Sequence, residues 1–254
     1  MADDRSSLTG KVALVTGGTR GIGKGIAFAL GKAGARVVVV SRKEAAVASV
    51  ADELIGAGIE ASGVAVNVSN LDDLAAVVAH ATSAHGGLDI LVNNAAVNPV
   101  FGPIEQTSPA AFEKIMRVNV QAPLELAKLA LPVMQSRGGG AILNIASIGG
   151  ISPEANLGIY SVSKAALISL TKALAKEWGK HKIRVNVLCP GLVRTDFSSA
   201  LWQNEGILKR AMRQQAIEHL AEPDDIAGLA LLLCSDAGAF CTGGVYMADG
   251  GYTI

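Results

Sequence analysis

The sequence predicts an α/β fold: one doubly wound domain in which about seven parallel strands are flanked by helices on both faces. Short apolar, β-branched runs alternate with longer helical stretches along the whole of the 254-residue chain. These runs lack the polar alternation of a half-exposed strand, so each strand is expected to be buried on both faces. No linker-like stretch interrupts the alternation, which favours a single domain over two.

The first half of the chain contains four expected strands and the helices that connect them. The strands are VALV at 12–15, RVVVV at 36–40, SGVAV at 62–66 and LDILV at 88–92, and the helices cover 22–34, 43–58 and 70–86. Valine and isoleucine favour strands because their branched side chains pack well on a pleated surface. A helix between successive strands predicts right-handed crossovers and therefore parallel pairing.

The second half continues the same pattern with longer helices. Helical regions at about 109–136 and about 157–180 precede the strands AILNIAS at 141–147 and IRVNVLC at 183–189, and a last helix at 224–234 precedes GGVYMADGG at 243–251. In folds of this type ligands bind beyond the carboxyl ends of the strands. The residues that follow each strand are therefore the candidates for a site.

Composition narrows the possible partners. The chain has 22 basic and 22 acidic residues and no long block of one sign, so its charge predicts neither nucleic acid nor an acidic membrane as a partner. No apolar run reaches the length of a membrane span. We expect a small-molecule ligand.

Cysteines, histidines and the N-terminus predict a cytoplasmic protein without a metal. The cysteines Cys189, Cys234 and Cys241 are odd in number and lack CxxC spacing, which indicates free thiols in a reducing compartment. The four histidines form no metal-ligand motif. The N-terminal segment MADDRSS is polar and acidic, unlike a signal or transit peptide, and the final YTI is not a peroxisomal signal.

The segment TGGTRGIG at 16–23 follows the first strand and opens the first helix. Gly17, Gly21 and Gly23 suit a turn in which backbone amides approach a phosphate without a Cβ in the way. A tight strand-to-helix connection without a ligand is the alternative for a glycine-rich turn by itself.

Further motifs follow the later strands in a fixed order. They are NNAA at 93–96, Asn119 within a helix, Ser147 at the end of a strand, Tyr160 and Lys164 in YSVSK, and Pro190 with Gly191. In this order and spacing the chain resembles the short-chain dehydrogenase/reductase family from Lys11 to Gly251. It departs from the family pattern at Ala96, where glycine is usual, and we interpret Ala96 as a tolerated small residue.

The resemblance implies a single NAD(P)-binding Rossmann-fold catalytic domain over residues 1–254, with Asn119, Ser147, Tyr160 and Lys164 as its catalytic residues. Reduction of a carbonyl by hydride requires an acid for the forming alkoxide, and Tyr160 is the expected donor. Lys164 lies on the same helix face, and we expect its ammonium group to lower the pKa of Tyr160. Ser147 can hydrogen-bond the same substrate oxygen.

Asn119 has two interpretations. From the residues alone, a polar side chain that satisfies helix backbone and a side chain that serves catalysis are equal alternatives. The resemblance favours the second and gives Asn119 the role of holding a water that relays protons to Lys164.

The expected cofactor is NADPH. Relatives that prefer NAD carry a carboxylate at the end of the second strand, where this chain has Ser41, while Arg42 and Arg20 are placed to bind a 2′-phosphate. The cofactor-binding residues that we expect are Gly17, Thr19, Arg20, Gly21, Ile22, Gly23, Ser41, Arg42, Asn67, Val68, Asn94, Ala95, Ala96, Tyr160, Lys164, Pro190, Gly191, Val193 and Thr195.

The substrate is expected beneath a lid at about 192–215, the region that covers the substrate in the family. Helix core is the alternative for the apolar residues of this stretch. The expected pocket residues are Phe101, Ile148, Phe197, Leu201 and Trp202. Such an apolar pocket suits an aromatic or aliphatic ketone or aldehyde rather than a free sugar.

The stretches VNPVFGPI, ISP and GLVRTDFSSALW resemble the carbonyl-reductase and retinol-dehydrogenase-like branch. One alternative is a 3-oxoacyl-carrier-protein reductase, which should have a basic patch for the acidic carrier near the pocket mouth; Lys180, His181 and Lys182 could form it, but a solvated helix end explains this run equally well. Another is a non-catalytic nucleotide-binding regulator, which the complete catalytic set argues against. The resemblance also implies a homotetramer formed through the two long helices near 109–136 and 157–180.

Overall fold

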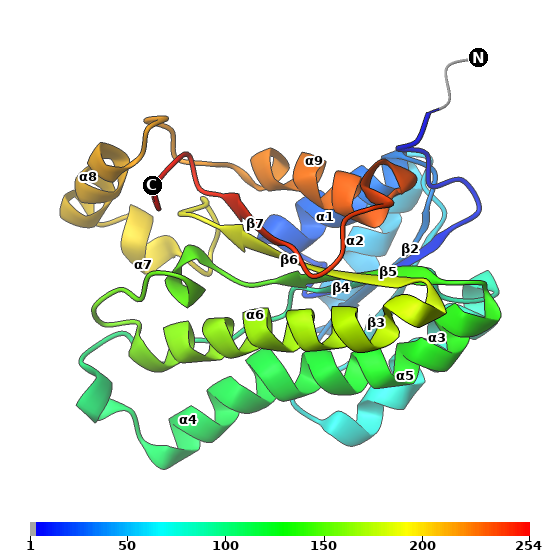
Figure 1. Ribbon diagram of the computed structural model, residues 1–254, viewed down its shortest axis with the longest axis horizontal. Coiled ribbons are helices and arrows are strands. Elements are labelled where there is room, and N and C mark those ends of the chain that lie inside the picture. The colour runs from blue at the N-terminus through cyan, green and yellow to red at the C-terminus, as the bar shows by residue number, and fades with distance from the viewer. Residues whose placement is uncertain (1–3) are drawn as a thin grey trace.

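The computed structural model describes residues 4–254 and contains a seven-stranded parallel sheet between two layers of helices (Figure 1). The first three residues of the segment MADDRSS lie outside the described residues. The strands are β1 (Val12–Thr16), β2 (Arg36–Ser41), β3 (Ala61–Ala65), β4 (Ile90–Asn93), β5 (Gly140–Ile145), β6 (Ile183–Pro190) and β7 (Val245–Ala248). All seven predicted strands are present.

The principal helices are α1 (Gly21–Lys32), α2 (Glu44–Gly56), α3 (Leu74–His85), α4 (Pro109–Met116), α5 (Ala122–Ser136), α6 (Gly158–Trp178), α7 (Ser199–Trp202), α8 (Glu205–Gln214) and α9 (Pro223–Cys234). Short 3₁₀ turns cover Leu71–Asp73, Ile104–Gln106, Ile148–Gly150, Gly179–His181 and Asp236–Gly238. Most of the predicted helical stretches are therefore helices in the structure, and their ends differ from the predicted ends by a few residues.

The strand order β3-β2-β1-β4-β5-β6-β7 reverses direction at β1. The chain adds β2 and β3 on one side of β1 and then crosses to the other side to begin β4, so that Val15 pairs with both Val39 and Val92. The loops after β1 and β4 consequently diverge and leave a crevice at the carboxyl end of the sheet.

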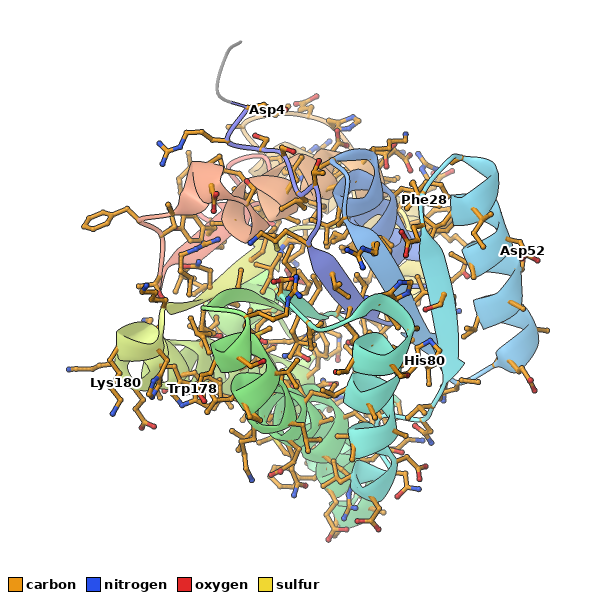
Figure 2. The ribbon with its side chains drawn as sticks, turned by 90° about the vertical axis from the view of Figure 1, so that its right-hand side faces the viewer. Asp4, Phe28, Asp52, His80, Trp178 and Lys180 are labelled. Carbon is orange, nitrogen blue, oxygen red and sulfur yellow. The ribbon has the colours of Figure 1, made fainter. Side chains whose placement is uncertain are left out.

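Two apolar layers cover the sheet. Buried side chains of α1, α2 and α9 pack on one face, and those of α3, α5 and α6 pack on the other. All five residues of β1 are buried, which explains why the strand sequences lack polar alternation. Figure 2 shows these side chains from the end of the molecule that carries Asp4, Trp178 and Lys180.

The region at 109–136 differs from a regular helix. A π-helical turn at Arg117–Gln121 separates α4 from α5 and contains Asn119. Single π turns inside α-helices are frequent at functional sites, because the extra residue redirects side chains and backbone groups. No helix among residues 4–254 is long and apolar enough to cross a membrane.

Candidate active site

The glycine turn between β1 and α1 has the geometry that the sequence predicts. Gly17 and Gly21 have φ angles of +62° and +52°. A Cβ on Gly17 would lie 2.8 Å from Asn94 Nδ2, and one on Gly21 would lie 2.9 Å from Thr195 Cγ2. A Cβ on Gly23 would overlap the Gly17 carbonyl. Only glycine fits these positions, so the backbone is left open toward the crevice.

Hydrogen bonds from Asn94 connect this turn to the end of β4. Its Nδ2 donates to the carbonyls of Thr16 and Gly17 at 2.9 and 3.1 Å, and its backbone N–H donates to Thr16 Oγ1 at 3.0 Å. The second asparagine of NNAA thus holds the two loops of the crevice together.

A cavity of about 310 Å³ lies in this crevice. Most of the expected cofactor-binding residues line it: Gly17, Thr19, Arg20, Gly21, Ile22, Ser41, Arg42, Asn67, Val68, Asn94, Ala95, Ala96, Tyr160, Lys164 and Thr195. Four do not. Gly23 lies within the first turn of α1, while Pro190, Gly191 and Val193 lie at the end of β6, where Val193 is buried.

Tyr160 and Lys164 place the N-terminal end of α6 in the cavity wall. Both side chains are buried, and Lys164 Nζ lies 5.6 Å from the centre of the Tyr160 ring. The ammonium group donates to the Ile145 carbonyl at 2.7 Å. The pair therefore sits one helical turn apart against the end of β5.

Burial shifts the pKa values of this pair in opposite directions, because a buried site disfavours the charged form of each group. It raises the pKa of Tyr160 well above its usual value, although a hydrogen bond with Ser147 acts the other way, and it lowers the pKa of Lys164 to about 8. The expected lowering of the Tyr160 pKa by Lys164 is wrong for this structure. Desolvation dominates, and the ammonium group is directed at a backbone carbonyl.

Ser147 ends the segment that follows β5 and begins a 3₁₀ turn. Its Oγ accepts a hydrogen bond from the Gly149 N–H at 3.1 Å. Its side chain is also close enough to Tyr160 to affect the pKa of that residue, which it lowers against the effect of burial. The structure thus brings Ser147, Tyr160 and Lys164 together.

The Asn119 side chain makes its hydrogen bonds to residues outside its own helix. Its Oδ1 accepts from the Val97 N–H at 2.9 Å, and its Nδ2 donates to the Val97 carbonyl and to Ser163 Oγ, both at 3.0 Å. The side chain joins the loop after β4 to α6. Its role with a water stays a prediction.

The five expected pocket residues do not form one surface. Phe197 lines the cavity, is 49% exposed and lies with its ring centre 5.9 Å from that of Tyr160. Ile148 is buried in the 3₁₀ turn, and Phe101 is exposed on the loop after β4. Leu201 and Trp202 lie in α7, outside the cavity lining.

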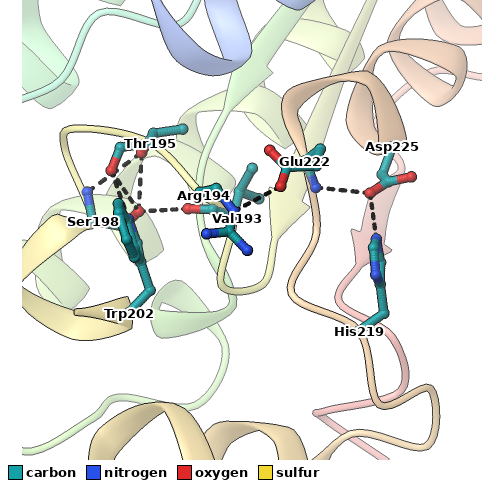
Figure 3. Close-up of polar contacts among 8 residues, drawn as sticks. All are labelled: Val193, Arg194, Thr195, Ser198, Trp202, His219, Glu222 and Asp225. Carbon is teal, nitrogen blue, oxygen red and sulfur yellow. Dashed lines mark hydrogen bonds and ion pairs between the residues drawn. The ribbon is translucent and has the colours of Figure 1, made fainter. Parts of the chain in front are cut away.

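The predicted lid consists of α7, α8 and the segments that flank them. Trp202 Nε1 donates to the Thr195 carbonyl at 2.9 Å, and the Arg194 guanidinium lies 5.3 Å from the Trp202 ring centre (Figure 3). Arg194 also pairs with Glu222 at 2.7 Å. Trp202 therefore holds the segment that places Thr195 in the cavity wall.

The two arginines expected at the cofactor both line the cavity but differ in their partners. Arg20 forms an exposed ion pair with Asp196 at 3.4 Å. Arg42 is exposed and makes no ion pair within residues 4–254. Ser41 ends β2, so no carboxylate occupies that position.

Several cavity residues were missed from the sequence. They are Val40, Val66, Ser69, Val97, Lys114, Val118, Ile145, Ala146 and Asp196. Asp196 adjoins Thr195 and Val97 adjoins NNAA, so proximity to a motif was a usable signal for these two. Lys114 and Val118 come from α4 and the π turn, whose position over the cavity has no signal in the local sequence.

Known proteins are similar to this chain over almost its whole length. A family model described as enoyl-(acyl carrier protein) reductase matches residues 5–253. Dehydrogenase/reductase SDR family member 4 of Homo sapiens is 43% identical over 250 residues, which cover 97% of this chain and 89% of that protein.

Solved structures share the fold over nearly the whole chain. A 7α-hydroxysteroid dehydrogenase complexed with NADH and 7-oxo glycochenodeoxycholic acid has a TM-score of 0.95 at 34% identity, covering 99% of this chain and 97% of that one. L-sorbose reductase from Gluconobacter frateurii, complexed with NADPH and L-sorbose, has a TM-score of 0.92 at 34% identity, covering 98% of this chain and 99% of that one. The predicted resemblance is confirmed, and the chain belongs to the short-chain dehydrogenase/reductase family.

Proposed function

We propose that this chain is an NADPH-dependent oxidoreductase that reduces a ketone or aldehyde to an alcohol. The observation that supports this most strongly is the buried Tyr160–Lys164 pair beside Ser147, in the wall of the cavity behind the glycine turn. Gly17 and Gly21 turn the backbone with positive φ angles at the N-terminus of α1, where backbone N–H groups can bind a dinucleotide phosphate.

When bound, the reduced nicotinamide cofactor supplies the hydride that a carbonyl carbon accepts. Negative charge then develops on the carbonyl oxygen, and Tyr160 donates its Oη proton to that oxygen. The raised pKa of Tyr160 keeps this proton in place at neutral pH. Ser147 Oγ hydrogen-bonds the same oxygen, and the Lys164 ammonium adds positive charge near the developing alkoxide.

The preference for NADPH is supported by charge at the end of β2. Ser41 leaves no carboxylate to repel a 2′-phosphate, and Arg42 and Arg20 both line the cavity. Arg20 can exchange its exposed partner Asp196 for a phosphate at little cost, since exposed ion pairs contribute about 0 to 1 kcal/mol.

The test is kcat/KM for NADPH and NADH with one ketone, in the wild type and in Arg20→Ala and Arg42→Ala. If each arginine contributes about 1.5 to 3 kcal/mol, NADPH should be preferred by a factor on the order of 100 or more. Each variant should lose part of this preference, and high salt should weaken it. Equal efficiency with both cofactors in the wild type would contradict the proposal.

The substrate is proposed to be an apolar carbonyl compound. Phe197 lies against the Tyr160 ring and supplies an aromatic wall at the point where the reacting oxygen must sit. A panel of aromatic, aliphatic and sugar ketones, followed by NADPH absorbance, tests this choice. Faster turnover of free sugars than of apolar ketones would overturn it.

A second candidate is reduction of a 3-oxoacyl group on an acyl carrier. Lys180, His181 and Lys182 do not support this candidate, because they follow the C-terminal end of α6, about 30 Å along the helix from Tyr160 at 1.5 Å per residue. Lys209, Arg210 and Arg213 of α8 are exposed on the lid instead, and these are the residues that favour the candidate.

One assay separates the two candidates. A triple variant in which Lys209, Arg210 and Arg213 are each replaced by glutamine should leave turnover of a free ketone unchanged. It should raise KM for a carrier-bound substrate only if a carrier-bound acyl group is the natural substrate of the protein. A non-catalytic regulator would bind NADPH and turn over neither substrate.

We also propose a homotetramer and a cytoplasmic location. Phe112 of α4 and Val162 of α6 are exposed apolar residues on the helical layer that would form the interface. The odd number and the spacing of Cys189, Cys234 and Cys241 support the second proposal, since unpaired thiols persist in a reducing compartment. Light scattering and cell fractionation test these two proposals.

A further inference from the structure

A buried hydroxyl links the π-helical turn to the catalytic helix. Ser163 lies in α6 between Tyr160 and Lys164 and is 0% exposed. Its Oγ donates to the Tyr160 carbonyl at 2.6 Å and accepts from Asn119 Nδ2 at 3.0 Å. One side chain thus contacts the backbone of the proposed acid and the side chain of a predicted catalytic residue.

The link continues to the cavity wall. Asn119 bonds to both backbone groups of Val97 at 2.9 and 3.0 Å, and Val97 lines the cavity. A continuous series of hydrogen bonds therefore runs from the loop after β4, through the π turn, to the backbone of Tyr160. All of its side-chain members are buried, so water does not compete for these bonds.

The bond from Ser163 to Tyr160 spans the turn of α6 that sets the Tyr160–Lys164 spacing. A serine hydroxyl that bonds to the carbonyl one turn earlier adjusts the local bend of a helix. We propose that Ser163 is a positioning residue: its hydroxyl fixes the first turn of α6 against Asn119, so that the Tyr160 Oη and Lys164 Nζ are held in place for proton transfer. This inference rests on the proposed oxidoreductase function.

The same helix offers a matched comparison. Ser161 is also buried, at 1% exposed, yet its Oγ has no hydrogen-bond partner among residues 4–254. Ser161 and Ser163 therefore share residue type, helix and burial and differ in the network. Truncating each to alanine removes the same atom and isolates the effect of the hydrogen bonds.

Loss of the Ser163 hydroxyl leaves one of the two Nδ2 hydrogens of the buried Asn119 without an acceptor. Asn119 Nδ2 keeps its bond to the Val97 carbonyl, so Ser163→Ala is expected to fold. The catalytic pair loses its fixed position, and misplacement of reacting groups by about 1 Å can cost up to 100-fold in rate. We expect a decrease in kcat of about 10-fold.

The experiment measures kcat, KM for NADPH and for one ketone, and the pH profile of kcat in three variants. Ser163→Ala should lower kcat, leave KM for NADPH unchanged and shift the pH profile, since the surroundings of Tyr160 and Lys164 change. Ser163→Thr keeps the hydroxyl and should recover most of the wild-type kcat. Ser161→Ala should match the wild type in all three readouts.

A further variant tests the network directly. In an Asn119→Ala background, Ser163→Ala should cause little additional loss of kcat, because the two residues act through one set of bonds. Should Ser163→Ala fail to fold, Ser163→Cys replaces it, since a thiol still fills the site but makes weaker hydrogen bonds. Ser163→Cys is then expected to lower kcat, but by less than the loss of about 10-fold expected for Ser163→Ala.

Three results would overturn the positioning role: wild-type kcat and pH profile in Ser163→Ala or Ser163→Cys, equal losses in Ser163→Ala and Ser163→Thr, or equal losses in Ser163→Ala and Ser161→Ala. A wild-type protein that binds NADPH but reduces no carbonyl compound contradicts the proposed function, and with it the role assigned to Ser163.

Discussion

Burial of Tyr160 and Lys164 in the same site shifts their pKa values in opposite directions. The buried site disfavours both charged forms, so it raises the pKa of the phenol and lowers that of the ammonium group to about 8. At neutral pH the tyrosine still carries its proton and the lysine still carries its charge. These are the states that an acid and its cationic neighbour need.

Replacing Tyr160 with phenylalanine tests the acid directly. The change removes the proton donor and keeps the ring that packs against Phe197, so kcat should fall at least about 100-fold with little change in cofactor affinity. Single-turnover kinetics and cofactor titration measure the two effects. Near wild-type turnover would show that another group supplies the proton.

The lowered pKa of Lys164 predicts that cofactor binding depends on pH. Below about pH 8 the side chain is charged and attracts the anionic cofactor, and above about pH 8 it is neutral. The Kd for NADPH should therefore rise as pH increases through about 8, by at most about 10-fold per pH unit for one proton.

Fluorescence titration between about pH 7 and about pH 9 measures this dependence. Lys164→Met should bind more weakly and lose the step, whereas Lys114→Met, at another lysine of the cavity wall, should keep it. A constant Kd across this range in the wild type is incompatible with the assignment.

At the scale of elements, the lid is anchored at both ends. Val193 and Ala221 form a parallel bridge, and the Arg194 N–H donates to the Ala221 carbonyl at 2.8 Å. Beside this bridge, Glu222 caps α9 and pairs with Arg194 (Figure 3). The two ends of the lid thus meet next to the N-terminus of α9.

The α9 cap also holds the segment that follows the lid. Asp225 accepts from the Glu222 N–H and from His219 Nε2, both at 2.8 Å, and these hydrogen bonds lower the pKa of Asp225. The segment that leaves α8 is therefore fixed by the same helix end that binds Arg194 through Glu222.

Arg194→Met should loosen the lid. The change removes both the pair with Glu222 and the cation over Trp202, which contribute about 0.5 to 1 kcal/mol each at exposed sites. We expect a higher KM for bulky ketones, little change in kcat, and a change in Trp202 emission. Since the chain has two tryptophans, a Trp178→Phe background leaves Trp202 as the only one.

Lys209→Met is the control for this variant, because Lys209 is an exposed lid cation whose pair with Glu205 stays within α8. Equal changes in emission and KM for the two variants would remove the specific role of Arg194.

At the scale of the molecule, the crossing of the chain at β1 places the loops of β1, β4 and β5 around one cavity. Helix α6, which carries Tyr160 and Lys164, lies on one face of the sheet, and the α1 and α9 helices lie on the other (Figure 1). Both layers contribute to the site, so the cavity depends on the whole sheet.

The outer face of α6 is proposed to bind other copies of the chain. Val162→Glu places a charge on this exposed apolar position and should shift the tetramer toward smaller species in light scattering. Ala48→Glu, on the exposed face of α2, should leave the mass unchanged. A wild-type monomer, or a tetramer unaffected by Val162→Glu, would contradict the proposed interface.

The sequence by itself determined the strands, the glycine turn and the pairing of Tyr160 with Lys164 on one helix face. These features depend on local properties: apolar runs, glycine geometry and the 3.6-residue period of a helix. The strand predictions were confirmed for this reason, and the π turn at Asn119 was missed because nothing in its local sequence distinguishes it from a regular helix.

Only the tertiary structure decided which side chains share a surface and how strongly each is desolvated. Arg20 and Asp196 meet across 176 positions of sequence, Ile148 is buried rather than exposed to a substrate, and Tyr160 gains rather than loses proton affinity. The physical reason is that burial and long-range contacts depend on the packing of all layers around a residue, whereas sequence spacing records only its neighbours along the chain.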